Sequence, residues 1–168
     1  SENLINKIWI RKEINRYNKF YILKDKDSGQ NSKSKIKKLS ILLNNNNIDL
    51  QFISASENVA WLLNLRGTDS EFTPIPNSYL IINNKGKSYL FCNLKKINTK
   101  LKKKIVKNLI IQDTKYLKNF ILKIKDKVFQ LDNLSCSIFF RNIIKRNNKI
   151  IETQDPVYLF KSIKNKAE

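Results

Sequence analysis

The stretch AWLLNLRGTDSEFTPIP, residues 60–76, carries most of the information in this chain. It begins as an apolar helical run and stops at Arg66-Gly67-Thr68-Asp69, which an irregular segment with two prolines follows. Folds often present binding residues in this way, on a loop positioned by a buried element. The alternative is a plain helix C-terminus, with Gly67 as its left-handed cap and Arg66 near the negative end of the helix dipole. Local physics by itself favours this second interpretation.

Hydrophobic periodicity and turn residues predict alternating strands and helices along the rest of the chain. Strands are predicted over 20–23, 49–53, 77–82, 88–92, 109–111, 128–131 and 150–151. Helices are predicted over 36–43, the run containing Trp61, 94–105, 117–124, 138–143 and a closing helix from Pro156. Residues 25–34 are expected to form a polar loop, and Ser54 with Glu57 is a capping-box pattern before the helix of Trp61.

This order of elements predicts an α/β fold, with a mixed, mainly parallel sheet covered by helices. The turn sequence Asn83-Asn84-Lys85-Gly86 indicates one hairpin within that sheet. A chain of 168 residues with 41% hydrophobic residues can bury one ordinary core. We therefore expect a single domain.

The net charge of +19 raises the question of a nucleic-acid or membrane partner. Only five of the 33 basic residues are arginine, the residue that favours bidentate phosphate and base contacts. Asparagine and isoleucine are also abundant and share A/T-rich codons with lysine, so genome composition explains the charge. We expect no nucleic-acid partner. The alternative, a free-standing basic module that binds nucleic acid or acidic surfaces, predicts a salt-dependent shift of labelled DNA or RNA.

The sequence shows no run near the length of about 20 apolar residues that spans a membrane, and no signal peptide. We therefore expect a cytoplasmic protein without a membrane partner. Cys92 and Cys136 are isolated and lack CxxC spacing, which favours buried structural thiols.

The residue inventory predicts that the chain catalyses nothing by itself. It has no histidine, which excludes histidine-type metal sites and Ser-His or Cys-His nucleophiles within it. With three glycines and no phosphate-loop motif, a phosphate cradle is not expected. Four carboxylates flank predicted strands, and each is more simply a turn or cap residue: Asp49, Asp113, Asp132 and Asp155.

The stretch 60–76 resembles the non-catalytic domain that precedes the pita-bread metallopeptidase domain in Xaa-Pro aminopeptidases of the creatinase/prolidase superfamily. In that family, a helix close to AWLLNLRGSD leads into an aromatic and proline-containing loop and a strand beginning Ser-Tyr, here Ser78-Tyr79. Residues 3–9 are similar to the family's N-L-I-x-x-I-W segment, and residues 29–39 to its G-x-x-S-x-x-K-I-x-x-L motif. Asp155-Pro156 and residues 161–168 resemble the linker helix that opens the catalytic domain.

The resemblance implies a ribonuclease-H-like α/β sandwich and a middle domain cut from a longer enzyme. Residues 1–16 would close a preceding domain, 17–154 would form this domain, and 155–168 would lead to an absent catalytic domain. The intact homo-oligomeric enzyme would remove an N-terminal residue that precedes proline from a peptide substrate. Two divalent metal ions, most often manganese, would be held by the pita-bread domain, and no cofactor is expected in this fragment.

By the same resemblance, the candidates for a wall of the substrate pocket are Arg66, Asp69 and Phe72. Arg66 is expected either to bind a substrate carboxylate or carbonyl, or to pair with Asp69 and stiffen the loop, and we favour the pair. Phe72 stands where the family often has tyrosine, and Ser70-Glu71 replaces a more usual apolar-proline pair. Trp61 is expected in the core.

Overall fold

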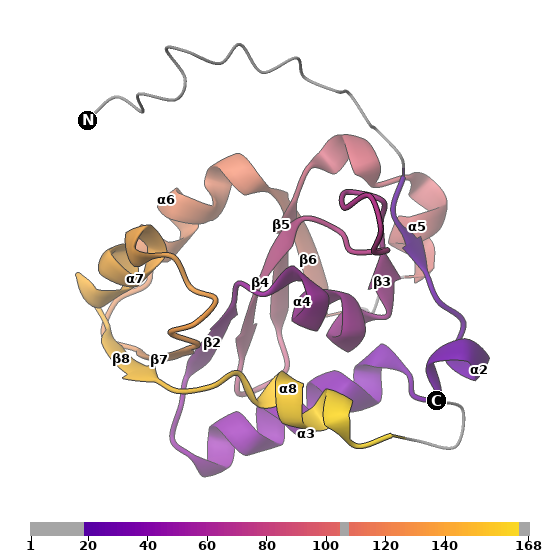
Figure 1. Cartoon of the computed structure of the whole chain (residues 1–168). Coiled ribbons are helices and arrows are strands. Elements are labelled where there is room, and N and C mark those ends of the chain that lie inside the picture. The colour runs from indigo at the N-terminus through magenta and orange to yellow at the C-terminus, as the bar shows by residue number, and fades with distance from the viewer. Residues whose placement is uncertain (1–18, 105–107, 165–168) are drawn as a thin grey trace.

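The computed structural model describes residues 19–104 and 108–164 (Figure 1). Six strands of this part form one sheet in the order β6-β5-β4-β2-β7-β8. The strands are β2 (Leu50–Ile53), β4 (Ser78–Asn83), β5 (Ser88–Cys92), β6 (Leu109–Asp113), β7 (Val128–Leu131) and β8 (Lys149–Glu152). The pairs β5–β6, β2–β7 and β7–β8 are parallel, and β2–β4 and β4–β5 are antiparallel. This mixed, mainly parallel sheet confirms the predicted fold class.

Helices cover both faces of the sheet (Figure 1). The α-helices are α2 (Asp25–Ser28), α3 (Ser32–Asn45), α4 (Ser56–Leu63), α5 (Thr99–Lys104), α6 (Leu117–Leu122), α7 (Ile138–Lys145) and α8 (Pro156–Ser162). Short 3-10 turns η1 (Leu94–Lys96) and η2 (Thr114–Tyr116) follow β5 and β6. Buried side chains of α3, α4, α5 and α8 pack on one face, and those of α6 and α7 pack on the other.

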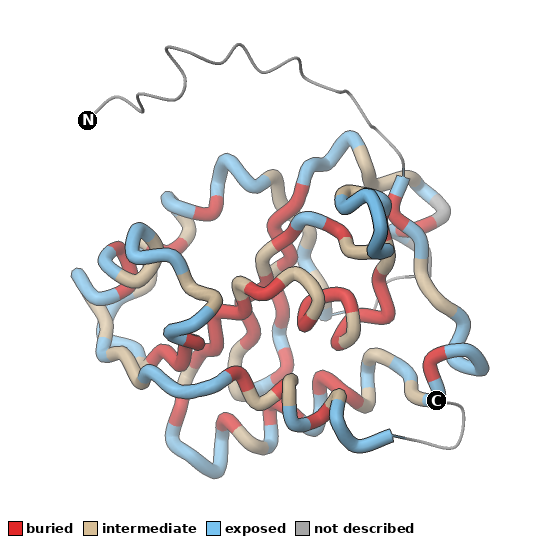
Figure 2. The backbone as a smooth tube through the Cα atoms, viewed as in Figure 1, coloured by how far each residue is buried: buried red, intermediate tan, exposed pale blue. Residues whose placement is uncertain are grey.

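The strands divide their side chains between two cores because successive residues of a strand point to opposite faces. In β4, Leu80 and Ile82 face the α3–α4 side, while Ile81 faces α6 and α7. In β2, Ile53 and Phe52 divide in the same way. Figure 2 shows the buried residues concentrated along the central strands and on α4.

A second sheet, of two strands, fixes the start of the loop within residues 60–76. β1 (Tyr21–Ile22) pairs antiparallel with β3 (Leu65–Arg66), with Tyr21 opposite Arg66. Phe20, just before β1, is buried and its backbone N–H donates to the Lys96 carbonyl, 2.9 Å away. These contacts join three segments that are far apart in the sequence.

Three local predictions are wrong, each because a competing contact determines the structure. The predicted loop over 25–34 contains the single-turn helix α2, with acidic Asp25 and Asp27 at its N-terminal end. The predicted helix over 94–105 is interrupted, since the Asn98 side chain accepts from Leu101 N (2.7 Å) and starts a new helix, α5. Ile105, the last residue of that predicted stripe, lies outside the described residues, as does the segment 1–16.

The third wrong prediction is the capping box of Ser54 and Glu57. α4 begins at Ser56 after Ala55, with no side-chain cap. The Ser54 hydroxyl instead lies 2.9 Å from the hydroxyl of Ser135, and Glu57 accepts from the Tyr158 hydroxyl at 2.9 Å. Both side chains therefore join α4 to distant segments rather than close its first turn.

Candidate functional site at the carboxyl edge of the sheet

A polar cleft of about 500 Å3 lies at the edge where β2, β5 and β6 end. Ser54 follows β2, Asn93 follows β5 and Thr114 follows β6, so three strands that run in the same direction each contribute a side chain. Ligands of open α/β sheets usually bind at this carboxyl edge. The lining residues are Ser54, Ser56, Asp69, Asn77, Ser78, Tyr79, Asn93, Lys96 and Thr114.

Asp69 is the one predicted site residue that lines this cleft. Its carboxylate forms a close ion pair with Lys96 of η1 and accepts from the backbone N–H of Asn77 at 2.7 Å. Both charged side chains are largely buried, at 7% and 14% exposed. The loop from Gly67 to Asn77 is therefore closed at its base, and Gly67 N donates across it to the Pro74 carbonyl at 3.2 Å.

Arg66 is bound to its own segment and not to Asp69, so the predicted pair between them is wrong. The Arg66 Nη1 donates to the carbonyls of Ala60 (2.8 Å) and Leu65 (2.9 Å). Ala60 lies in the last turn of α4, and its carbonyl also accepts from the backbone N–H of Asn64. Burial lowers the pKa of the guanidinium, and the facing Tyr21 acts in the opposite direction. Arg66 thus closes the C-terminal end of α4, as the simpler sequence interpretation expected.

Helix α4 ends earlier than the position of Gly67 suggested. Asn64, with φ 52°, is the left-handed cap, and its N–H reaches the carbonyls of Ala60 and Trp61. The buried Lys35 of α3 holds this cap by donating to the Asn64 Oδ1 (2.8 Å) and the Trp61 carbonyl (3.0 Å). The capping role predicted for Gly67 is therefore wrong.

Gly67 is required for a close approach and not for a positive φ. A Cβ at this position would lie 2.8 Å and 2.9 Å from two ring carbons of Phe20 and 3.0 Å from the Cα of Pro76. Among the described residues, the glycines with positive φ are Gly29 and Gly86. Gly67 thus allows the loop to cross directly over the buried Phe20 ring.

Phe72 lies at the tip of this closed loop and is 93% exposed. Its neighbours Ser70, Glu71, Thr73 and Pro74 are exposed as well. The loop therefore has a fixed base and an aromatic side chain that the described part of the chain does not cover. Phe72 and Arg66 do not line the cleft.

Sequence reasoning missed a buried polar network beneath α8. The Asp155 carboxylate, 3% exposed, accepts from the side-chain amides of Gln51 and Asn58, each at 2.7 Å, and from Val157 N at 3.0 Å. Burial raises the pKa of Asp155, and these three donors oppose that shift. The predicted cap role of Asp155 is confirmed, but its two amide partners are distant in the sequence and only the fold brings them near.

Asp113 and Asp132 act as turn or cap residues, since Asp113 accepts from Lys115 N and Asp132 from Leu134 N. The turn or cap role predicted for Asp49 is wrong, because its carboxylate accepts from Val128 N, 79 residues away at the start of β7. Of the two thiols, Cys92 is fully buried, and burial raises its pKa to about 12. Cys136 is only half-buried, contrary to the expectation, and burial raises its pKa to about 11.

The described residues do not supply the donors of a dinuclear metal site. Within residues 19–104 and 108–164, no three Asp, Glu, Cys or His side chains form a group that could hold a metal ion. The buried carboxylates of Asp69 and Asp155 are each taken up by a lysine or by amide donors. In the same part of the structure, no helix has the length and apolarity needed to cross a membrane.

Comparison with known proteins identifies the family. The family model described as Creatinase/Prolidase N-terminal domain matches residues 11–168. The chain belongs to this family. The resemblance seen in the sequence is thereby confirmed.

The relatives of this creatinase/prolidase N-terminal domain are Xaa-Pro aminopeptidases. Xaa-Pro aminopeptidase 1 of Dictyostelium discoideum is 33% identical over 177 residues, which cover 99% of this chain and 27% of that protein. Xaa-Pro aminopeptidase ApepP of Drosophila melanogaster is 37% identical over 83 residues, covering 49% of this chain and 14% of that protein. The chain thus spans about a quarter or less of the length of these relatives.

Solved structures share the fold. The X-prolyl aminopeptidase of Caenorhabditis elegans, described as a cytosolic enzyme with a di-nuclear active site, superposes with a TM-score of 0.85 at 21% identity, covering 99% of this chain and 28% of that one. The isolated N-terminal domain of the cytoplasmic peptidase PepQ from Mycobacterium tuberculosis gives a TM-score of 0.54 at 11% identity, covering 76% of this chain and 98% of that one. A domain of this fold can therefore be crystallised on its own.

Proposed function

We propose that this chain is a non-catalytic domain of an Xaa-Pro aminopeptidase, with the catalytic pita-bread domain in the same polypeptide. Relatives named Xaa-Pro aminopeptidases that are about four times as long support this assignment. The parent enzyme would remove an N-terminal residue that precedes proline and would act in the cytoplasm as a homo-oligomer. Two divalent metal ions, with manganese as the expected species, would activate the attacking water in the catalytic domain.

The loop between Gly67 and Asn77 would form part of the wall of the substrate pocket. Two features of the loop support this role: Asp69 holds its base, and Phe72 at its tip is 93% exposed. An aromatic side chain carried on a loop with a fixed base can limit the length of a bound peptide, because less of the loop has to be ordered on binding. Arg66 donates its hydrogen bonds through Nη1, so its Nε and Nη2 have no hydrogen-bond partner among the described residues and would be available to a substrate carbonyl.

The test uses the full-length protein and peptides of increasing length that begin Xaa-Pro. Phe72→Ala is expected to change kcat/KM for the longer peptides by up to about tenfold, equivalent to about 1.4 kcal/mol. The change in kcat/KM for the shortest peptide should be smaller. Phe72→Tyr should behave like the native protein, and Ile41→Ala on α3 provides an exposed apolar control. Failure to cleave any Xaa-Pro peptide with added divalent metal would reject the enzyme assignment. Equal kinetics of Phe72→Ala and the control would reject only the role of the loop.

A further inference from the structure

A second pocket, of about 470 Å3, is lined by the first half of α3 and by the turn that joins β4 to β5. Two of its lining residues, Gly86 and Asn108, come just before β5 and β6, so the pocket lies at the amino ends of these parallel strands. We call it the amino-edge pocket. The polar cleft lies at the carboxyl ends of the same strands. The two sites are therefore on opposite edges of the sheet.

Three lysines line the amino-edge pocket, and all three are exposed. Lys33 and Lys37 are one turn apart on α3, and Lys85 belongs to the β4–β5 turn. Within residues 19–104 and 108–164, none of the three side chains forms an ion pair or a hydrogen bond. Lys96 in the polar cleft, by contrast, is neutralised by Asp69. Like charges four residues apart on a helix repel each other, so an anion bound in this pocket would relieve an unfavourable arrangement.

The lining of the pocket is otherwise mainly apolar. Ile36, between Lys33 and Lys37 in the sequence, lines the pocket and is only 6% exposed. Gly86 faces it, because a Cβ at Gly86 would lie 3.6 Å from Ile36 Cγ2 and 3.6 Å from Ser40 Oγ. Sites for small molecules combine an apolar lining with a few charged groups in a volume of about 300–1,000 Å3. The amino-edge pocket has this character.

The backbone around the pocket is held by its own hydrogen bonds. The Asn83 side chain accepts from Lys85 N at 3.0 Å, and the Asn83 carbonyl accepts from Gly86 N at 2.9 Å. Ser88 N donates to the Asn108 carbonyl at 3.0 Å, which joins the turn to the start of β6. Because this backbone is already ordered, a ligand would have to fix only the lysine side chains, and the entropy cost of binding is correspondingly small.

We propose that the amino-edge pocket binds an organic diphosphate, a molecule with a diphosphate group at one end and an apolar or aromatic body at the other. The diphosphate would lie among the ammonium groups of Lys33, Lys37 and Lys85, and the body would cover Ile36. A terminal phosphate alone carries about −1.5 to −2 charges at pH 7, so a diphosphate can neutralise three lysines where a single carboxylate cannot.

The site differs from a phosphate loop. Lysine binds phosphate as a point charge and needs no glycine-rich backbone, so the missing phosphate-loop motif does not exclude this ligand. The site is also independent of the peptidase assignment, because it lies at the opposite edge of the sheet from the cleft that Asp69 lines.

The experiment is isothermal titration calorimetry of the 168-residue chain at an ionic strength of 0.15 M, without metal ions. ADP tests an aromatic body and geranyl diphosphate an aliphatic one, and the tighter of the two identifies the source of the diphosphate. We expect at least one of them to bind with a stoichiometry of one and about tenfold more tightly than inorganic diphosphate, because its body buries apolar area. Adenosine and geraniol, which lack the charges, should bind at least about tenfold more weakly than their diphosphates.

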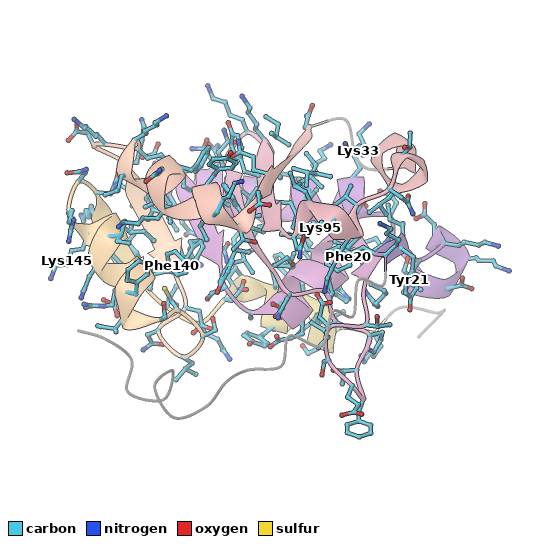
Figure 3. All side chains as sticks on the ribbon, turned by 90° about the horizontal axis from the view of Figure 1, so that it is seen from above. Phe20, Tyr21, Lys33, Lys95, Phe140 and Lys145 are labelled. Atoms are coloured by element: carbon cyan, nitrogen blue, oxygen red, sulfur yellow. The ribbon has the colours of Figure 1, made fainter. Side chains whose placement is uncertain are left out.

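A matched pair of variants separates the pocket from the overall charge. Lys85→Gln and Lys145→Gln each remove one exposed charge. Figure 3 shows Lys33, a residue of the pocket, and Lys145 of α7 at opposite ends of the molecule. Lys85→Gln should weaken the tighter probe by about three- to fivefold. Lys145→Gln should weaken it by less than about 1.5-fold, because the Debye length is about 8 Å at this ionic strength.

Thermal unfolding without ligand checks that the variants are folded. Both should melt within a few degrees of the native chain, because both side chains are exposed. Three outcomes would overturn the proposal: no saturable binding of either probe, inorganic diphosphate binding as tightly as the better probe, or equal losses for Lys85→Gln and Lys145→Gln. Equal losses would assign the attraction to the net charge of +19 alone. None of these outcomes bears on the cleavage of Xaa-Pro peptides, which is measured separately.

Discussion

Replacing Gly67 with alanine tests whether this position serves a close approach or only a turn. The backbone at Gly67 does not have a positive φ, so alanine fits it conformationally and by itself would stabilise the chain by about 0.4–1 kcal/mol. The added Cβ, however, would lie 2.8 Å from the Phe20 ring and 3.0 Å from the Cα of Pro76. Phe20 is 1% exposed, so its ring cannot swing into solvent.

The clash decides the sign of the effect. Inserting one carbon into a packed region costs about 1–3 kcal/mol, more than the backbone gain. We therefore expect Gly67→Ala to lower the free energy of unfolding by about 1–2 kcal/mol. Urea unfolding of the 168-residue chain, followed by tryptophan fluorescence, measures this as a lower midpoint at an unchanged slope.

A double-mutant cycle identifies the clashing partner. In a Phe20→Leu background the penalty of Gly67→Ala should shrink, with a coupling of about 1 kcal/mol for residues in contact. Gly86→Ala is the matched control, because Gly86 has φ 80° and its Cβ would meet no atom closer than 3.6 Å. The change in free energy of unfolding caused by Gly86→Ala should be the same in the native and in the Phe20→Leu background. A neutral or stabilising Gly67→Ala, or a penalty independent of Phe20, would refute the close-approach explanation.

Three further predictions concern buried groups. Lys35→Met should lower the free energy of unfolding by about 2–4 kcal/mol in urea titrations, because the Trp61 carbonyl and the Asn64 amide oxygen lose their buried donor. Because the fold raises the pKa of Asp155, this residue contributes to the free energy of unfolding most at acid pH. The contribution is fully present below the ordinary aspartate pKa of about 4 and is lost as the pH rises through the pKa of the folded state. The melting temperature of the native chain relative to Asp155→Asn should thus fall as pH increases, and a constant or rising difference would contradict this sign. A thiol reagent at pH 8 should label half-buried Cys136 before fully buried Cys92, as followed by mass spectrometry, and equal rates would contradict the burial of Cys92.

Several elements of the fold could be predicted from the sequence because their signals are local. Leu39 and Leu43 are one turn apart in α3 and both are buried, and the turn over 83–86 closes the β4–β5 hairpin as expected. The errors occur where a distant partner competes with a local pattern. Ser54 and Glu57 form a good capping pattern, but hydroxyl groups of Ser135 and Tyr158, 81 and 101 residues away, bind them instead.

The same distinction holds for the candidate site. The stretch 60–76 by itself determined that an apolar helix ends in a loop, and it identified the family, because these depend on residue order alone. Which residues pair within that loop depended on the tertiary structure. Lys96, 27 residues from Asp69, takes the carboxylate that local reasoning gave to Arg66. Arg66 is only three residues from Asp69, but its guanidinium donates to the carbonyls of Ala60, in the last turn of α4, and of the adjacent Leu65. Proximity in the sequence indicates which side chains could pair, whereas the packing of the chain decides which of them form hydrogen bonds or ion pairs.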